Sequence, residues 1–437
     1  MMISHASESV MLFVDRLFLS RVSKVHLAAA MGGGITNFML MSFFVGVVGY
    51  VNAIVGQYYG SKQKERCILA TVQSIYLSFA AFPFVLAFLP LTRFFFQLFG
   101  LEAEQVTLAN DYLRILLSGS VMFILRNALT GFFTGIGRTR MVMAANLTAM
   151  IVNVPANYLF IFGALGVPAM GMRGAAIGTL CGHFAALLML GIPFLKHARS
   201  EEFRGARQWR FDRKLVKKLL RFGGPAGIES LLNVAAFNFF VQMMHSYGPD
   251  VAAAVTIAFN WDLVAFIPML GLGIATTAII AQNIGAGDYN EARKSAFLVL
   301  RLAFVYSGSM MIIFLTATRP MVTIFSSGFG EGAAEVSGLA LVLVRLASLY
   351  LIADSTQLIF AGALRGAGDT AWVMRFSVLM HWLLAGAVFA AVRLLVLPPV
   401  AVWCIFIAMI LTLGFSMFNR FRRGKWENIK LIDNETE

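Results

Sequence analysis

The feature that most constrains this chain is a series of long apolar segments that recurs from one end to the other. Each holds about 20 mostly apolar residues, the length that an α-helix needs to cross a bilayer. Charged residues make up only 13% of the chain, against about 25% in soluble domains. We therefore predict an all-α polytopic membrane protein with twelve transmembrane helices. They are expected at 3–19, 27–58, 68–91, 112–131, 142–162, 175–195, 222–247, 251–280, 296–317, 336–362, 373–397 and 400–418.

The basic residues indicate how these helices are oriented. Much of the net charge of +13 falls in the loop 196–221 and in the tail 420–437, and the shorter loops on the same side are also basic. Lys and Arg mark the cytoplasmic side of membrane proteins. We expect a multi-pass protein of the bacterial inner membrane with both termini in the cytoplasm. Because the charge flanks apolar helices, the expected partner is the lipid bilayer and not a nucleic acid.

The first apolar segment has an unusual start. It begins at residue 1 without a hydrophilic lead-in, and it contains polar residues such as Ser4, His5 and Glu8. Either the helix begins there, or the natural start of the protein lies upstream. The second alternative is favoured.

Two short motifs occur once in each half of the chain. Gln57 and Gly60 match Gln282 and Gly285, at an offset of 225 residues, and the GIGRT segment 135–139 matches GAGDT at 366–370. Six helices separate the matched positions, so the halves are parallel repeats, an arrangement that suits alternating access to a central site. We divide the chain into an N-terminal half (1–195), a basic cytoplasmic linker (196–221), a C-terminal half (222–419) and a tail (420–437). No nucleotide-binding segment of the Walker type occurs, which argues against ATP as the energy source.

Polar residues in the N-terminal half are expected at one depth in the membrane. Asp15, Asn153, Asn157 and Thr179 all fall in the outer half of their predicted helices, and the two Asn residues share a helix face. One carboxylate, two amides and a hydroxyl suit a small hard cation or a proton. The alternative is that the Asn residues only join helices and that Asp15 pairs with Arg16.

Acidic residues also fall within the helices of the C-terminal half. Glu229 and Asp354 have similar predicted depths, which permits a shared carboxylate site for a proton or a cation. Asn233 lies one turn from Glu229, and Gln357 follows Asp354, so both are weaker candidates. Asp262 is a third weaker candidate, for which a hydrogen bond between helices is the preferred interpretation.

The remaining reactive residue types give no catalytic pattern. The three cysteines lie in or beside apolar helices without metal-like spacing, and no nucleophile–base pair stands out. Intramembrane His183 and His381 are interpreted as packing or hydrogen-bonding residues, and Arg126 is a further polar residue within the predicted helices. We expect no enzyme activity, no cofactor and no structural metal.

The motifs together resemble the multidrug and toxic compound extrusion (MATE) family over essentially the whole chain. The segments that carry the resemblance are VD at 14–15, QYYG at 57–60, GIGRT at 135–139, NVPANY at 153–158, GAAIGT at 174–179, FGGP at 222–225, ADSTQ at 353–357 and GALRG at 362–366. The resemblance implies twelve helices in two lobes that form a V, with export driven by Na⁺ or H⁺.

The resemblance also assigns residues. It implies that Asp15, Asn153, Asn157 and Thr179 match the N-lobe cation site, and that Asp354 matches the acidic residue of the C-lobe in the NorM branch. Asn157 stands where the DinF branch has Asp, so the chain is more similar to NorM. One departure is Asn233, which occupies the position of a NorM Glu, and Glu229 one turn away is a possible substitute.

The function implied is secondary active export of small amphipathic organic cations in exchange for Na⁺ or H⁺, by a monomer. A lipid-linked saccharide flippase of the same superfamily is the main alternative. Its phosphate-bearing cargo would favour basic residues facing the cavity, whereas acidic residues dominate the candidate sites here. A membrane scaffold is the remaining alternative.

Overall fold

The computed structural model describes residues 2–92, 103–205, 208–326 and 333–432. Every regular element in these ranges is helical, and none is a strand, which confirms the predicted all-α class. In the N-terminal half the elements are α1 (Met2–Val22), α2 (Lys24–Gly49), α3 (Val51–Gly60), α4 (Lys64–Leu86), η1 (Leu89–Leu91), α6 (Ala103–Ser118), α7 (Ser120–Gly135), α8 (Thr139–Phe162) and α9 (Met172–Arg199).

The short helix α10 (Arg213–Lys218) leads into the C-terminal half. The elements there are η2 (Leu219–Gly223), α11 (Gly224–His245), α12 (Pro249–Gly285), α13 (Tyr289–Thr316), α14 (Thr318–Ser326), α15 (Ala333–Ser348), α16 (Leu351–Ala367), α17 (Thr370–Phe389), η3 (Ala390–Leu394), α18 (Pro399–Arg422) and η4 (Lys425–Asn428).

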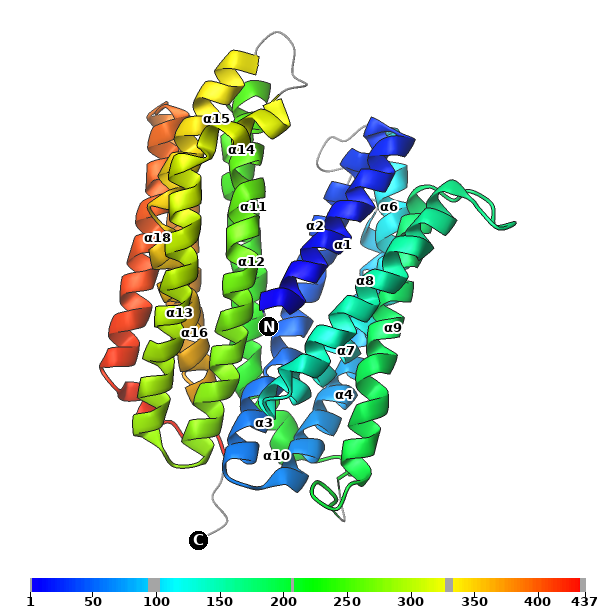
Figure 1. Ribbon diagram of the computed structural model, residues 1–437, viewed down its shortest axis with the longest axis vertical. Coiled ribbons are helices and arrows are strands. Elements are labelled where there is room, and N and C mark those ends of the chain that lie inside the picture. The colour runs from blue at the N-terminus through cyan, green and yellow to red at the C-terminus, as the bar shows by residue number, and fades with distance from the viewer. Residues whose placement is uncertain (1, 93–102, 206–207, 327–332, 433–437) are drawn as a thin grey trace.

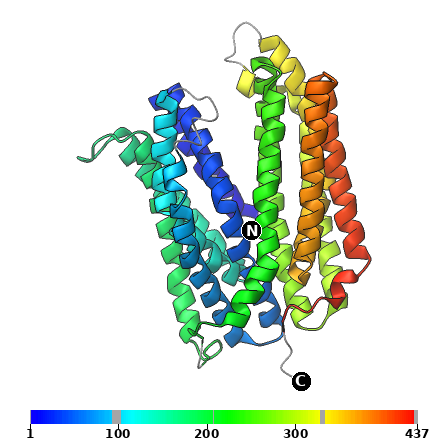
Figure 2. The ribbon, with the colours of Figure 1, turned by 180° about the vertical axis from the view of Figure 1, so that it is seen from behind.

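The described helices account for the twelve predicted spans. Eight are long and apolar enough to cross a membrane, and the bent pairs α6–α7 and α15–α16 raise this number to ten. Helices α1 and α11 run beside the others in both views and complete the set (Figures 1 and 2). They are less apolar because α1 carries Glu8, Asp15 and Arg16, and α11 carries Glu229 and Asn233.

Several spans differ from the prediction in their detail. The helix expected at 27–58 is broken at Tyr50, the one at 112–131 begins earlier and bends by 51° near Gly119, and the one at 336–362 bends by 47° between Ser348 and Leu351. The sequence reading also placed α14 in a loop. Apolar composition reports that a segment is buried in lipid, but it does not report where the helix bends.

The two halves form separate bundles that meet at one end. Figure 1 shows them close together near α3 and α10, and diverging towards the end that carries α14. Contacts between the halves run from α3 to α12, from α2 to α11 and from α1 to α12. Glycines allow the close approach: a Cβ atom at Gly46 would lie 2.6 Å from the Cα of Gly227. Small residues of this kind are common where membrane helices touch. The result is the V-shaped arrangement of two lobes, here called the N-lobe (α1–α9) and the C-lobe (α11–α18).

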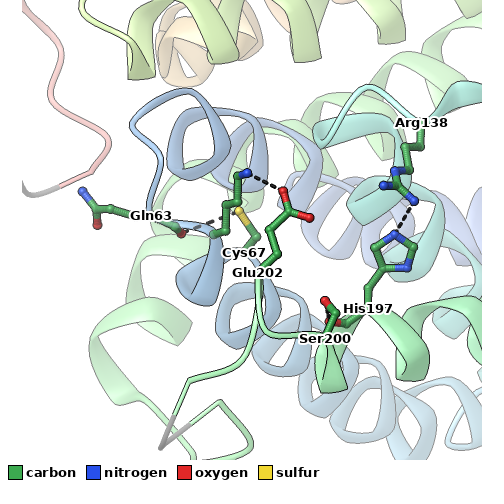
Figure 3. A network of polar contacts seen from close by, with 7 residues as sticks. Gln63, Cys67, Arg138, His197, Ser200 and Glu202 are labelled. Carbon is green, nitrogen blue, oxygen red and sulfur yellow. Dashed lines mark hydrogen bonds and ion pairs between the residues drawn. The ribbon is translucent and has the colours of Figure 1, made fainter.

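The basic linker is attached to the N-lobe by polar contacts. Lys64 forms an ion pair with Glu202, and His197 contacts Arg138 (Figure 3). The Gln73 side chain donates to the carbonyl of Arg210 at 2.9 Å and accepts from the amide of Asp212 at 2.9 Å. The linker expected as a loop at 196–221 is therefore partly helical, because α9 continues to Arg199 and α10 follows.

Candidate functional site

The four polar residues predicted for the N-lobe converge in the structure. The amide of Asn157 donates to one carboxylate oxygen of Asp15 and, at 3.2 Å, to the side-chain oxygen of Asn153. The hydroxyl of Thr179 lies 3.4 Å from the other carboxylate oxygen of Asp15. Asp15 is 5% exposed, and both Asn residues are fully buried. Helices α1, α8 and α9 thus build one enclosed cluster, here called the Asp15 cluster.

Local sequence explains why these helices come so close. A Cβ atom at Gly178 of α9 would lie 2.0 Å from the side-chain oxygen of Asn157, and one at Gly182 would lie 2.9 Å from the carbonyl of Ala149. Only glycine permits this approach of α9 to α8. Pro155 lies inside α8 and cannot donate to the carbonyl one turn earlier, which leaves a backbone acceptor beside the cluster.

The Asp15 cluster holds polar atoms without a hydrogen-bond partner among the described residues. They are the side-chain oxygen of Asn157 and the side-chain nitrogen of Asn153. Tyr112 of α6 lies within electrostatic range of Asp15. Buried polar atoms are normally satisfied, so an unpaired amide oxygen beside a carboxylate fits the ligand set of a small cation. Tyr112 was missed by the sequence reading.

A second polar network lies two turns before the Asp15 cluster along α1 and α8. Arg126 of α7 forms an ion pair with Glu8 of α1 and a 3.0 Å contact with His183 of α9, and Asn146 of α8 lies 3.4 Å from Glu8. The Arg126 side chain is 9% exposed and that of Glu8 is 31% exposed. The sequence analysis predicted a packing or hydrogen-bonding role for His183 and no partner for Arg126.

Spacing would have revealed this Glu8 network. Glu8 lies two turns before Asp15 on one face of α1, and Asn146 lies two turns before Asn153 on one face of α8. Polar residues at this spacing on two helices predict two stacked layers, of which only one was recognised.

The acidic residues of the C-lobe pair differently from the prediction. Asp354 of α16 lies within electrostatic range of Asp262 of α12, and the hydroxyl of Tyr350 donates to Asp262 at 2.8 Å. The predicted hydrogen bond between helices at Asp262 is confirmed. These two carboxylates, which interact electrostatically, are here called the Asp354 pair, and the Tyr350 phenol binds one of them.

Glu229 does not share a site with Asp354, so that prediction was wrong. Its carboxylate accepts a hydrogen bond from Arg365 at 2.7 Å. Arg365 is eleven residues after Asp354 on α16, which corresponds to about 16 Å along a helix. The sequence reading counted Arg365 as a loop charge, whereas α16 continues to Ala367 and directs this side chain towards α11.

The other two weaker C-lobe candidates are Asn233 and Gln357. The Asn233 amide donates to the hydroxyl of Ser377 at 2.8 Å, which joins α11 to α17, and its side-chain oxygen has no partner among the described residues. Gln357 is partly exposed, three residues after Asp354 on α16.

Comparison with known proteins gives a consistent result. Residues 1–159 and 225–392 match the family model described as MatE. The chain is 27% identical over 382 residues to the probable multidrug resistance protein NorM of Shewanella oneidensis, covering 87% of this chain and 82% of the relative. It is 26% identical over 420 residues to the protein of the same name from Thermotoga maritima, covering 95% and 84%.

Solved structures share the fold. A multidrug resistance MATE family transporter of the MOP superfamily, described in an outward-facing conformation, matches with a TM-score of 0.89 at 20% identity, covering 98% of this chain and 95% of that one. A MOP superfamily transporter from Pyrococcus furiosus, described as having a binding pocket of reverse polarity, matches with a TM-score of 0.88 at 21% identity, covering 98% and 94%.

Proposed function

The chain belongs to the MatE family of membrane transporters, and from this premise we propose that it exports small amphipathic organic cations in exchange for Na⁺ or H⁺. Multidrug efflux is supported by the relatives named multidrug resistance protein NorM. The proposed protein is a monomer of the bacterial inner membrane with both termini in the cytoplasm, and it needs no cofactor beyond the coupling ion.

The observation that carries the proposal is the environment of Asp15. Its hydrogen-bond partners are the neutral side chains of Asn157 and Thr179, and its exposure is 5%. A charged group at membrane depth costs several kcal/mol unless a counter-charge or a proton neutralises it. Arg16, the next residue, interacts with Asp15 electrostatically but forms no ion pair with it in the described part of the chain. Amides and a hydroxyl supply no charge, whereas a coupling cation or a proton does. Binding and release of the ion would then change the charge of the Asp15 cluster during transport.

The Asp354 pair supports a second binding site for the coupling ion, in the C-lobe. Two carboxylates in a low-dielectric bundle repel each other, and a shared proton or a cation between them removes the repulsion. The cargo would enter between the lobes and compete with the coupling ion for these acids. The order of these steps is part of the proposal.

The arginines argue against the flippase alternative. A lipid-linked saccharide carries phosphates and needs arginine or lysine side chains that are available to it. Arg126 is engaged by Glu8 and Arg365 by Glu229, so both positive charges are already neutralised within their lobes.

Transport in vesicles tests the proposal. The purified full chain is placed in vesicles loaded with ethidium, and a Na⁺ or H⁺ gradient is imposed. We expect gradient-driven efflux that Asp15→Asn abolishes. Asp111→Asn is the matched control, because Asp111 is an acid at the edge of the N-lobe that pairs with Arg173. Efflux that persists in Asp15→Asn would contradict the proposed coupling, and transport of a lipid-linked sugar without transport of ethidium would favour the flippase.

A further inference from the structure

Two glutamines at matched positions of the repeat bridge the lobes in opposite directions. Gln57 of α3 donates from its amide to the carbonyl of Gly366 in α16, at 3.0 Å. Gln282 of α12 donates to the carbonyl of Gly135 in α7, at 2.7 Å. Each glutamine lies near the end of its helix, and each acceptor lies in the last turn of a helix of the other lobe. The two bonds are therefore reciprocal.

The backbones around these bonds touch. A Cβ atom at Gly60 would lie 1.9 Å from the carbonyl oxygen of Gln282, and one at Gly285 would lie 2.0 Å from the carbonyl oxygen of Gln57. A Cβ atom added at Gly56 would lie 2.8 Å from the Cβ atom of Ala281. Gln57 is 1% exposed. The helix ends α3 and α12 thus approach each other as closely as two helices can, and larger side chains there would separate the lobes.

Further contacts fix the C-lobe acceptor. The hydroxyl of Tyr50 donates to the carbonyl of Arg365 at 2.9 Å, and Asn52 donates to the carbonyl of Ile274 at 3.2 Å. The side chain of Arg365 is held by Glu229. Glu229 therefore helps to position the end of α16, where the N-lobe donors bind.

The two glutamine hydrogen bonds can break and re-form each time the lobes part at this end. The last carbonyls of a helix have no partner within the helix and must be satisfied by other groups. Here the glutamine of the opposite lobe satisfies them, and water can replace it when the lobes part. A neutral hydrogen bond of this kind contributes little net free energy, because folding exchanges it for bonds to water. Such a contact holds a closed state without making it permanent.

We propose that Gln57 and Gln282 are paired positioning residues that hold the lobes together at this end, and that both bonds break when the transporter opens there. This inference rests on the proposed function, because alternating access requires that end to open. It concerns neither cargo nor coupling ion. It explains why the glutamines and their acceptor turns recur together in both halves of the chain.

Thiol accessibility measures how often the lobes part. Ser61→Cys, which changes one atom of the side chain, is introduced into a chain whose native Cys67, Cys181 and Cys404 are replaced by alanine. Ser61 is partly buried and follows Gly60, whose backbone touches that of Gln282, so a water-soluble methanethiosulfonate reagent reaches the thiol faster when the lobes part. Each of Gln57→Leu and Gln282→Leu is expected to raise the labelling rate by roughly 2- to 12-fold, the range for one neutral hydrogen bond.

Two further variants separate the hydrogen bond from packing and from general stability. Gln57→Glu keeps the shape of the side chain but replaces the donor by an acceptor, so it is expected to raise the rate at least as much as Gln57→Leu. Gln73→Leu is the matched control, because Gln73 is fully buried and also donates to a backbone carbonyl, but its partners lie in its own lobe and the linker. It is expected to leave the rate unchanged.

The distance between spin labels at the exposed positions Arg140→Cys and Asn290→Cys gives a second measurement, in which the same variants should increase the population at long separation. The inference is overturned when both leucine variants label at the wild-type rate, when Gln57→Glu does so, or when Gln73→Leu opens the protein equally. Because neither measurement needs a cargo or an ion gradient, a failure of cation export leaves these outcomes unaffected.

Discussion

The two lobes share an architecture but hold different chemistry. In both, a span is bent near its middle, at Gly119 in the N-lobe and between Ser348 and Leu351 in the C-lobe. In both, an ion pair joins the first helix to this bent span, Glu8 to Arg126 and Glu229 to Arg365. The N-lobe then encloses one carboxylate among amides, whereas in the C-lobe Asp354 lies within electrostatic range of a second carboxylate, Asp262. The two halves of the repeat therefore share the bent span and its ion pair, but differ in the arrangement of their buried acidic residues.

The ion pairs show how far the lobes have diverged. At the repeat offsets of 225 and 231 residues, Asn233 corresponds to Glu8 and Gln357 corresponds to Arg126. The C-lobe has neutral residues there, and its own ion pair lies closer to the end where the lobes meet. The Glu8–Arg126 ion pair therefore supports the polar network next to the Asp15 cluster in the N-lobe. The Glu229–Arg365 ion pair of the C-lobe instead supports the contact between the lobes.

The largest expected effect is a loss of coupled efflux, and its size should differ between the Asp15 cluster and the Asp354 pair. Asp15→Asn removes the single carboxylate of its cluster, so we expect coupled efflux to fall by at least 100-fold. Asp354→Asn leaves Asp262 in place, so we expect a smaller loss of about 10-fold, with Asp262→Asn on the Asp354→Asn background removing the remainder. Initial efflux rates from vesicles under Na⁺ and under H⁺ gradients measure both. Equal losses for the two single variants would show that the lobes do not differ in this way.

Removal of the arginines compares the two ion pairs. Arg365→Leu leaves the Glu229 carboxylate, whose side chain is 5% exposed, without a counter-charge, so we expect a loss of about 3–5 kcal/mol in the free energy of unfolding. Arg126→Leu should cost less, about 1–2 kcal/mol, because the Glu8 side chain is 31% exposed and water can reach its carboxylate. Unfolding in mixed micelles measures both, with Arg140→Leu at an exposed position as the control. The reverse order would contradict the assignment of burial to these pairs.

Glycine substitutions test how the Asp15 cluster is packed. Gly178→Ala places a methyl group 2.0 Å from the Asn157 oxygen, so we expect a loss of about 1–3 kcal/mol in stability together with weaker coupled transport. Gly224→Ala in the C-lobe meets no atom within 4 Å and serves as the control. Thermal unfolding and efflux are measured on the same preparations. A stable, fully active Gly178→Ala protein would show that α8 and α9 can part at no cost.

The smallest expected effect concerns the linker. The hydrogen bond from Lys64 lowers the pKa of the Glu202 carboxyl, so the ion pair stabilises the linker above the ordinary pKa of a glutamate and is lost as the pH falls through the lowered value. Limited proteolysis of the linker should therefore accelerate at acidic pH. Glu202→Gln should remove this pH dependence, because no charge remains to titrate. A wild-type linker whose cleavage ignores pH would show that the other contacts, including those of Gln73, suffice.

The sequence by itself determined the class and the arrangement of the protein. The apolar segments fixed twelve helices because only a helix satisfies its own backbone within a bilayer. The matched motifs fixed two parallel halves. Asp15, Asn153, Asn157 and Thr179 could be brought together because depth and helix face follow from counting residues, and their convergence is confirmed by the structure.

The pairing of side chains on different helices was decided only by the tertiary structure. Counting placed Glu229 and Asp354 at one depth, but the extension of α16 to Ala367 brings Arg365 to Glu229 and leaves Asp354 to Asp262. The contacts of Gln57 and Gln282 depend on how two separate bundles meet. Periodicity fixes which face of a helix a residue occupies, but the neighbour of that face is set by packing, and packing depends on glycines and bends whose effect no single segment encodes.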